Sequence, residues 1–236
     1  MKNNFLTLLV TVFAALNMYG QDFLDGASTF SSNKESYFTL VDGTEITAFI
    51  DDIDRKKGLI EEITIKDANK KKRVLKPEEI KHMYLPPSGW DKLARADRIA
   101  GNITKWDEDK SAHAAHIKDG YVYFETTEVM IKKNKMTLLL QLVNPGFASK
   151  IKVFFDPYAS ETTSFGVGGF TVAGGDAKSY YVKKGEEVAF KLQKKNYEEE
   201  WEHLYGDCSS LKTEFTKKMG WGEVERHIYY YENSCN

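Results

Sequence analysis

The sequence has few of the features that assign an activity to a protein. Its formal net charge at pH 7 is only −2, from 33 basic and 35 acidic residues, so no overall field draws the chain to nucleic acid or anionic lipid. No serine, cysteine or threonine lies in a nucleophile elbow or a recognisable catalytic triad. Beyond the first twenty residues, no apolar run approaches the ~20 residues that span a bilayer. From motifs alone we therefore predict no catalytic residue, no metal, no cofactor and no membrane span.

The first twenty residues are typical of an export signal. Lys2 supplies a positive start, and Phe5–Leu16 forms a twelve-residue apolar run that is too short to cross a bilayer. We expect cleavage after Gly20; the alternatives are an earlier cut beside Ala15 and an uncleaved N-terminal helix. No cysteine follows the apolar run, so we expect no lipid anchor. The mature protein is predicted to be secreted or periplasmic.

The remaining chain divides into four parts. Residues 21–35 are polar and Ser-rich and predict a flexible tail, whereas residues 36–87 show the period-two alternation of short strands. Residues 88–118 begin with a helix pattern that ends at Gly101 and continue as a charged linker. Residues 119–236 combine strand patterns with helical patterns near the C-terminus. These patterns predict an α+β fold that is mostly β.

Five short β-type runs follow one another in residues 36–87, with a helical turn at Pro77 before the last run. This strand rhythm resembles the SH3-like, Sm-like and PRC-type barrels over residues 37–85. The resemblance implies a small five-stranded barrel and assigns no functional residue. The runs are Tyr37–Val41, Glu45–Asp52, Leu59–Lys66, Arg73–Lys76 and Lys81–Leu85.

The densest apolar stretch of the mature chain is Tyr121–Pro157, which we interpret as a central antiparallel sheet. Three successive leucines, Leu138–Leu140, predict a strand that is covered on both faces. The runs Lys178–Lys183 and Glu187–Leu192 add a last hairpin. From Asn196 onward, apolar residues recur at helical spacings, and glycines between the last two helices predict an antiparallel helical hairpin.

Only two cysteines are present, and they flank the predicted helical hairpin. Cys208 precedes one helix and Cys235 follows the other, so an antiparallel arrangement brings the two sulfurs within bonding reach. We predict a disulfide that closes a loop of 27 residues and persists in an oxidising compartment. The alternative is a zinc site formed by the cysteines with His203 and His227, but their spacing matches no known zinc finger.

The C-terminal region adds a second resemblance. A β-rich body followed by Lys194, then by Gly206-Asp207-Cys208 and a terminal Cys235, resembles uncharacterised secreted proteins of Gram-negative bacteria. The resemblance covers about 45 C-terminal residues. It implies the same compartment and the same crosslink, and it assigns no activity.

Two exposed features are candidate binding surfaces. A lysine-rich run forms the one basic patch, and on a small barrel such a patch could contact a phosphate backbone. Export and the lack of interleaved aromatic residues argue against nucleic acid. A tyrosine run on the last helix exceeds what one helix face needs for packing, and exposed aromatic rings can serve recognition. The candidate residues are Lys70, Lys71, Lys72, Arg73, Tyr229 and Tyr230.

The acidic and histidine clusters give no metal motif. Counting from Asp52, the calcium-loop pattern fails because Lys57 occupies the position that requires glycine. We interpret the acidic cluster as the solvated rim of a hairpin; its residues are Asp51, Asp52, Asp54, Glu61 and Glu62. His113 and His116 stand three residues apart but lack the glutamate of a zinc protease motif.

Three functional hypotheses remain. The first is an exported, non-catalytic module of the bacterial envelope or secretome that binds a protein or a surface polymer. The second is a secreted hydrolase whose carboxylates or histidines are brought together only by the fold. The third is nucleic-acid binding through Lys70–Arg73. A deep pocket with several acids or imidazoles would favour the enzyme, whereas a flat aromatic patch would favour the binding module.

Overall fold

The computed structural model describes residues 23–89, 114–161, 179–216 and 220–235. The predicted signal peptide and the predicted helix that ends at Gly101, from residue 90 onward, lie outside these ranges. Within the described ranges, no helix is long and apolar enough to cross a membrane.

Ten strands form one sheet in the described part of the chain. Nine of them follow the order β4-β3-β2-β1-β5-β6-β10-β9-β8, and β7 pairs with β6 outside this path. The strands are β1 (Glu35–Leu40), β2 (Glu45–Lys56), β3 (Leu59–Lys66), β4 (Lys72–Leu75), β5 (Ile80–Leu85), β6 (Val122–Ile131), β7 (Asn134–Gln141), β8 (Ile151–Phe155), β9 (Ser179–Lys184) and β10 (Ala189–Gln193).

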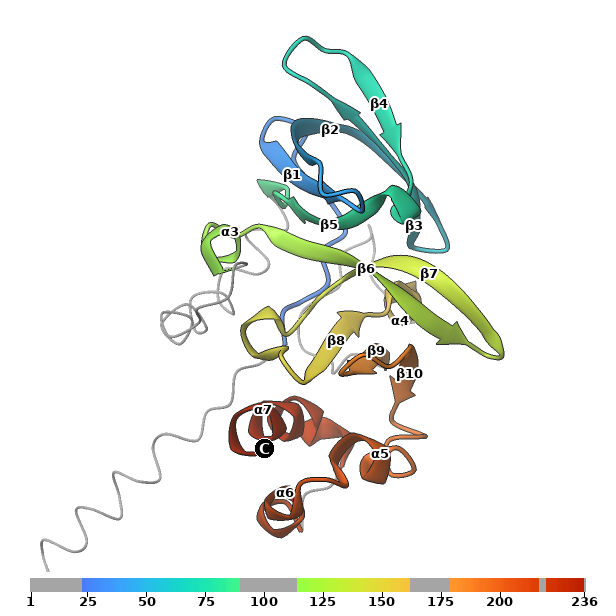
Figure 1. Cartoon of the computed structure of the whole chain (residues 1–236), viewed down its shortest axis with the longest axis vertical. Helices are drawn as coiled ribbons and strands as arrows, with labels where there is room; N and C mark the ends of the chain where they lie inside the picture. The colour runs from blue at the N-terminus through green and yellow to red at the C-terminus, as the bar shows by residue number, and fades with distance from the viewer. Residues whose placement is uncertain (1–22, 90–113, 162–178, 217–219, 236) are drawn as a thin grey trace, which may run out of the picture.

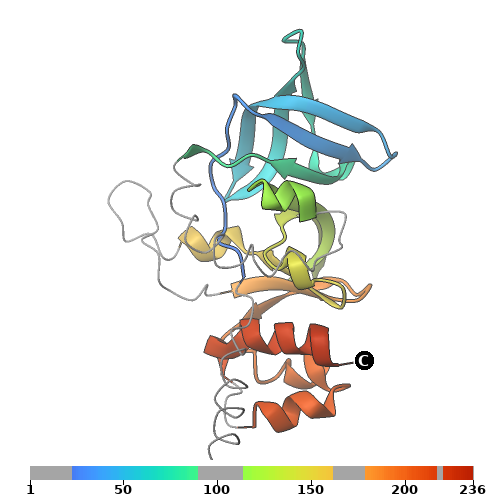
Figure 2. The same ribbon diagram turned by 90° about the vertical axis from the view of Figure 1, so that its left-hand side faces the viewer.

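Short helices cover the end of this sheet that is nearest the C-terminus. Figure 1 shows β1–β5 at one end of the molecule, β6–β10 in the middle and α5–α7 at the other end, and the turned view in Figure 2 shows the same three layers. The α-helices are α3 (Ala114–Lys118), α4 (Pro157–Glu161), α5 (Trp201–Tyr205), α6 (Ser209–Glu214) and α7 (Val224–Ser234). Single 3₁₀ turns occur at η1 (Pro77–Glu79), η2 (Pro145–Phe147) and η3 (Trp221–Glu223).

The five predicted strands of the first unit are present, but they do not close into a barrel. β5 lies beside β1, with Tyr37 opposite Tyr84, and its other edge pairs with β6. Closure into a barrel would require this second edge of β5 to pair with β4, the strand at the other end of the five-stranded group. Because β6 occupies it, the sheet instead continues across the predicted linker into the second half of the chain.

The central sheet also departs from a purely antiparallel one. β6 and β7 pair antiparallel, as do β8 and β9, but β10 runs parallel to β6 with Ala189 opposite Val129. A parallel pair needs a long connection. Here the connection is everything between the end of β6 and the start of β10, a distance along the chain that no local pattern could reveal.

Two hydrophobic cores lie on opposite faces of the sheet. The first core is enclosed by β1–β7 and is mainly aliphatic, with Ile63, Leu75 and Ile80 fully buried. The second core lies between β6–β10 and the C-terminal helices and is rich in aromatic rings. The leucine-rich strand β7 serves both, because Leu139 belongs to the first core and its neighbours Leu138 and Leu140 belong to the second. The prediction of a strand covered on both faces is confirmed.

Residues 23–31, which we call the strap, correct the prediction of a flexible tail. Phe23 is only 2 % exposed and packs in the second core, whereas Ala27 belongs to the first. The side-chain amide of Gln141 ties the strap to β7: its Oε1 accepts the N–H of Ala27 at 2.8 Å and its Nε2 donates to the carbonyl of Asp25 at 2.9 Å. A polar, Ser-rich composition concealed this role because few apolar residues are enough to anchor the segment.

Candidate binding surface

Three tyrosines line up across neighbouring strands. Tyr37 on β1 lies opposite Tyr84 on β5, and Tyr84 lies opposite Tyr123 on β6. Successive side chains of a strand point to opposite faces, and the alternate residues Phe38, Met83 and Phe124 face the first core. The three tyrosines therefore form a row on the other face of the same strands. Neighbouring strands lie about 4.8 Å apart, which sets ring next to ring.

Two histidines and a fourth tyrosine complete a group that we call the ring cluster: Tyr37, His82, Tyr84, His116, Tyr121 and Tyr123. The His116 ring, from α3, lies with its centroid 4.5 Å from those of both Tyr37 and Tyr84. Tyr121 lies 5.5 Å from Tyr37, and His82 lies 5.8 Å from Tyr84. These are the separations of packed aromatic pairs.

The ring cluster has a buried base and a half-exposed rim. Tyr84 and Tyr123 are 7 % and 5 % exposed, whereas Tyr37, His82, His116 and Tyr121 are only partly buried. The rim therefore leaves part of each of these four side chains at the surface, above the buried Tyr84 and Tyr123.

Tyr84, Tyr121 and Tyr123 stay protonated at physiological pH. Burial raises the pKa of Tyr84 to about 12. Burial, followed by a hydrogen bond with Tyr37, raises the pKa of Tyr121 to about 12. The pKa of Tyr123 is raised further, by burial and then by the nearby Glu125 carboxylate. These three side chains are thus neutral phenols, which can both donate and accept hydrogen bonds.

An ion pair borders the ring cluster. The Lys152 ammonium, from β8, donates to both oxygens of Glu125 at 2.8 and 2.9 Å, and the Tyr123 hydroxyl donates to the same carboxylate at 3.1 Å. Glu125 lies opposite His82 in the β5–β6 pairing. Three hydrogen bonds hold the Glu125 carboxylate in place. Glu125 therefore forms a fixed polar border of the ring cluster and does not act with a second carboxylate as a catalytic pair.

The predicted basic patch is largely neutralised. The Lys72 ammonium lies 2.6 Å from Asp51, which Lys66 also approaches at 3.6 Å, and Arg73 lies 3.5 Å from Glu79. The hydrogen bond from Lys72 is the main reason why the pKa of Asp51 is lowered. Lys70 and Lys71 occupy the β3–β4 turn and are exposed. The patch therefore belongs to a mixed-charge surface of β2–β4, and the structure does not bring it near the predicted tyrosines.

Tyr229 and Tyr230 are half-buried on α7. The Tyr229 ring meets that of Phe147 edge to face at 5.3 Å, and the Tyr230 ring meets that of Phe215 at 5.5 Å. Both rings thus contribute to packing between α7 and its neighbours.

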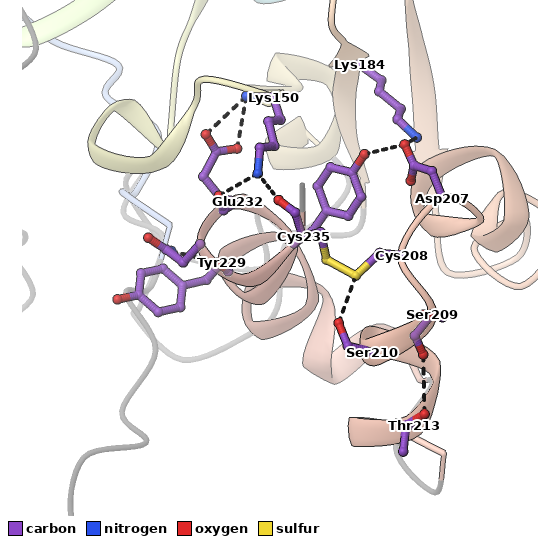
Figure 3. Close-up of a disulfide and its surroundings, with 12 residues drawn as sticks. Lys150, Lys184, Asp207, Cys208, Ser209, Ser210, Thr213, Tyr229, Glu232 and Cys235 are labelled. Carbon is purple, nitrogen blue, oxygen red and sulfur yellow. Dashed lines mark hydrogen bonds and ion pairs between the residues drawn. A yellow bond between two sulfur atoms is a disulfide. The ribbon is translucent and has the colours of Figure 1, made fainter.

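Cys208 and Cys235 are joined in a disulfide, with their Cα atoms 5.5 Å apart. The bond connects the start of α6 to the end of α7, so the two helices run in opposite directions. Figure 3 shows two lysines on either side of it: Lys150 donates to the carbonyl of Glu232 at 3.0 Å and also to that of Cys235, and Lys184 lies 3.1 Å from Asp207.

Two further contacts complete this arrangement, which we call the clasp. The Tyr231 hydroxyl donates to Asp207 at 2.7 Å. The Glu232 carboxylate accepts the backbone N–H groups of Ser149 and Lys150 at 2.6 and 3.0 Å. The clasp is defined by the disulfide with Lys150, Lys184, Asp207, Tyr231 and Glu232. It attaches the last helix to the loop before β8 and to the end of β9.

The described histidines and acids do not assemble a metal site. Within the described ranges, no group of three or more histidine, cysteine, aspartate or glutamate side chains is placed to hold a metal ion. His227 is fully buried, with its Nδ1 in a hydrogen bond of 2.6 Å with the Tyr197 hydroxyl. His203 lies on the surface between Glu187 and Glu200. The zinc alternative for the two cysteines is not supported, because both sulfurs are used in the disulfide.

Sequence reasoning missed the ring cluster, although a signal for it is present. On each of its three strands, a tyrosine directly precedes a residue of the first core: Tyr37 before Phe38, Tyr84 before Leu85 and Tyr123 before Phe124. Comparisons with family models, curated proteins and solved structures gave no match for this chain.

Proposed function

We propose that the chain is an exported, non-catalytic binding module that holds a surface polysaccharide on its ring cluster. The observation that carries this proposal is the half-exposed rim of Tyr37, His82, His116 and Tyr121 above a buried base. Sugar rings present C–H faces that pack on aromatic rings, and hydroxyl groups that pair with donors and acceptors beside those rings. The rim supplies aromatic rings and hydrogen-bonding groups within one small area.

A polymer suits this surface better than a large protein partner. A stable protein interface buries about 800 Å² on each partner and usually has an apolar centre. Among the described residues, the large exposed apolar side chains are scattered: Val41 lies after β1, Val74 lies on β4, and Met130 and Met136 lie on the β6–β7 hairpin. The aromatic rim beside the Glu125–Lys152 ion pair instead combines rings with polar groups, which a polysaccharide chain can use.

The hydrolase alternative receives less support from the geometry. The cavity that lies between the strap, β7 and α4 has no acid and no imidazole among its described lining residues. Glu125, the carboxylate at the ring cluster, is already held by Lys152 and Tyr123. Nucleic-acid binding through Lys70–Arg73 is also disfavoured, because Lys72 and Arg73 face carboxylates. Phosphate-backbone binding depends on cations that are available to the phosphates.

The proposal is tested by retention of the purified mature protein on insoluble peptidoglycan and on immobilised lipopolysaccharide and capsular polysaccharide. We expect retention by at least one of these polymers. The double variant Tyr37→Ala/Tyr121→Ala should weaken retention by roughly tenfold or more, because a few well-packed aromatic side chains carry most of the binding energy at such surfaces. Tyr121→Phe keeps the ring and removes the hydroxyl, so its loss should be smaller.

Tyr229→Ala is the matched control, because Tyr229 is a half-buried tyrosine on α7, away from the ring cluster. It should leave retention unchanged. Thermal unfolding of each variant separates lost binding from lost fold. Absence of retention on all three polymers, or an equal loss in Tyr229→Ala, would contradict the proposal.

A further inference from the structure

The closed end of the β6–β7 hairpin, residues 130–137, extends beyond the two cores, and we call it the hairpin tip. The pairing of the two strands continues to Ile131 opposite Asn134. On β7, the four residues Asn134–Thr137 are all exposed, although successive side chains of a strand point to opposite faces. Both faces of the hairpin therefore reach solvent here, and Figure 1 shows this end reaching out from the side of the molecule.

The hairpin tip carries two of the large exposed apolar side chains of the described residues. Met130 is 37 % exposed and Met136 is 44 % exposed. Met136 lies opposite the buried Val129, so it continues the second-core face of the hairpin outward, together with the half-buried Ile131. Met130 lies on the other face. Apolar atoms are thus exposed on both sides of one narrow element.

The charge of the hairpin tip is positive. The tip contains Lys132, Lys133 and Lys135 and no acidic residue. Lys135 pairs with Glu128, just outside the tip, at 2.9 Å. Lys132 and Lys133 form the turn and are exposed, and within the described ranges no ion pair or hydrogen bond occupies either ammonium group. The net charge of the chain is only −2, so the hairpin tip is a local attraction for anions and not part of an overall field.

These features fit the surface of an anionic bilayer better than a protein partner. A stable protein interface buries about 800 Å² on each partner. The hairpin tip is only two strands wide, but a soft lipid layer can surround both of its faces. Because the strands stay paired up to the turn, few unpaired peptide groups would enter the headgroup layer. Lysine side chains can reach the lipid phosphates while their carbon stems lie against apolar material.

We propose that the hairpin tip docks the protein onto an anionic lipid bilayer, with Lys132 and Lys133 at the lipid phosphates. Met130 and Met136 lie at the boundary between headgroups and acyl chains. In such peripheral binding, the burial of apolar area and the attraction to anionic lipid add together. The hairpin tip shares no residue with the ring cluster, so this contact goes beyond the proposed polysaccharide binding and does not depend on it.

The test is co-sedimentation of the purified mature protein with lipid vesicles at low salt. Vesicles of phosphatidylethanolamine and phosphatidylglycerol supply the anionic surface, and vesicles of phosphatidylcholine supply a neutral one. We expect binding to the anionic vesicles to be at least about tenfold stronger, and to weaken as the salt concentration rises, because salt screens exposed charges. No binding to the anionic vesicles, or equal binding to both kinds, overturns the proposal.

Two double variants locate the contact. Lys132→Gln/Lys133→Gln should weaken binding to the anionic vesicles by roughly tenfold or more, because each lysine near an anionic surface contributes about fivefold. Met130→Gln/Met136→Gln should weaken it by roughly fivefold or more, because it removes the apolar side chains that enter the layer. All four residues are exposed, and thermal unfolding checks that each variant is folded. Unchanged binding in either variant overturns the proposed contact.

Matched controls lie elsewhere on the same sheet. Lys70→Gln/Lys71→Gln removes two exposed lysines from the β3–β4 turn, where Lys70 has a φ of 63°, close to the 58° of Lys132. Val41→Gln/Val74→Gln removes the other two large exposed apolar side chains of the described residues. Both controls should bind the vesicles as the unaltered protein does. An equal loss in these controls would show that total charge or hydrophobicity decides the binding, and would overturn the proposal.

Tyr37→Ala/Tyr121→Ala separates this contact from polysaccharide binding. This variant should sediment with the anionic vesicles as the unaltered protein does, because neither tyrosine belongs to the hairpin tip. Loss of vesicle binding in this folded variant would place the lipid contact on the ring cluster and overturn the assignment to the hairpin tip.

Discussion

The two cores are held together by different kinds of contact. The first core consists of aliphatic side chains with Met83 and two phenylalanines, and the strands β1–β7 supply all of its buried residues except Ala27 of the strap. The second core contains tyrosines, tryptophans and a buried histidine whose polar atoms need partners, such as the bond between Tyr197 and His227. It is completed by short helices that the clasp fixes in place. A core built from strands needs only the correct alternation, whereas a core covered by short helices needs specific crosslinks.

Helix lengths explain why the second core needs the clasp. α5 and α6 have five and six residues, far below the length of about 12 to 15 residues at which an isolated helix becomes even marginally stable. Their stability must come from packing and from ties to the sheet. The comparison therefore predicts that damage to the clasp affects one region and spares the other.

The largest effect is expected from removal of the disulfide. The double variant Cys208→Ala/Cys235→Ala frees a 27-residue loop and should lower the free energy of unfolding by about 3.5 kcal/mol in the chain-entropy account. Urea unfolding measures the loss. Hydrogen exchange should show reduced protection in α6 and α7 and retained protection in β2 and β3. Equal loss of protection in both regions would show that the two cores do not differ as described.

The next effect is expected at the end of α7. Glu232→Gln weakens the bonds from the N–H groups of Ser149 and Lys150 and should lower the free energy of unfolding by about 2 kcal/mol, since hydrogen bonds to a charged group are worth roughly that amount. Glu79→Gln is the counterpart in the first region, because Glu79 also accepts a backbone N–H, at 2.9 Å from Lys76. It is more exposed and should cost less, about 0.5 kcal/mol. Urea unfolding that ranks the two variants the other way would refute the comparison.

A smaller, pH-dependent effect is expected at Asp207. Burial would raise the pKa of this carboxyl, but bonds from Tyr231 and Lys184 outweigh burial and lower the pKa. A pKa that is lower in the folded state adds stability above the unfolded value of about 4, and this stability is lost as the pH falls through the folded value. Because Asp207 is 52 % exposed, we expect less than about 1 kcal/mol.

The measurement is the difference in unfolding free energy between the unaltered protein and Asp207→Asn at several pH values. The unaltered protein should be the more stable at pH 7, and the difference should shrink below pH 4. Asp54→Asn, on the exposed rim of β2, serves as the control for a general change of charge. A difference that stays constant down to low pH would exclude the proposed role of the Asp207 carboxylate.

The smallest effect is expected for the ion pairs of the first region. Lys72→Ala removes a contact of 2.6 Å with Asp51, but the lysine side chain is 64 % exposed. Exposed pairs contribute between about 0 and 1 kcal/mol, so we expect a change below about 0.5 kcal/mol, and less at high salt. Urea unfolding at two salt concentrations checks this. A loss as large as that of Glu232→Gln would mean that surface charge also holds the first region together.

Local patterns predicted much of the first region. The period-two alternation predicted for residues 36–87 is present in β2, where Ala48 and Ile50 are buried and Thr47 is exposed, and the predicted turn at Pro77 is a 3₁₀ turn. These features depend on residues only a few positions apart, where side-chain period and proline geometry decide the structure. The prediction that the five strands close into a barrel was wrong, because β6 pairs with the edge of β5 that closure would need. β6 begins about 40 residues after β5 ends, beyond the reach of local patterns.

The candidate site could not be predicted in the same way. The ring cluster gathers Tyr37, Tyr84 and Tyr123, and nothing near any one of them indicates the other two. Their meeting follows from the pairing of β1 with β5 and of β5 with β6. The strap is attached through Gln141, an ordinary polar residue in the sequence, whose amide bonds to Ala27 and Asp25. Pairing between distant strands is set by the whole fold, so sites built across strands remain hidden from local reasoning.

The run Leu138–Leu140 weakens the hydrophobic signal that fixes the alignment of β7, because the first-core position receives a leucine in either neighbouring alignment. Sliding a strand by one position exchanges its two faces, and this normally drives polar groups inward. Here such a slip would still place a leucine at the first-core position of Leu139, but it would bring Thr137 or Gln141 to one of the two second-core positions. The next residue, Gln141, adds to the signal for the observed alignment, in which its amide bonds to both Asp25 and Ala27. The hydrogen bonds of one side-chain amide therefore help to hold β7 in the alignment that places Leu139 in the first core and Leu138 and Leu140 in the second.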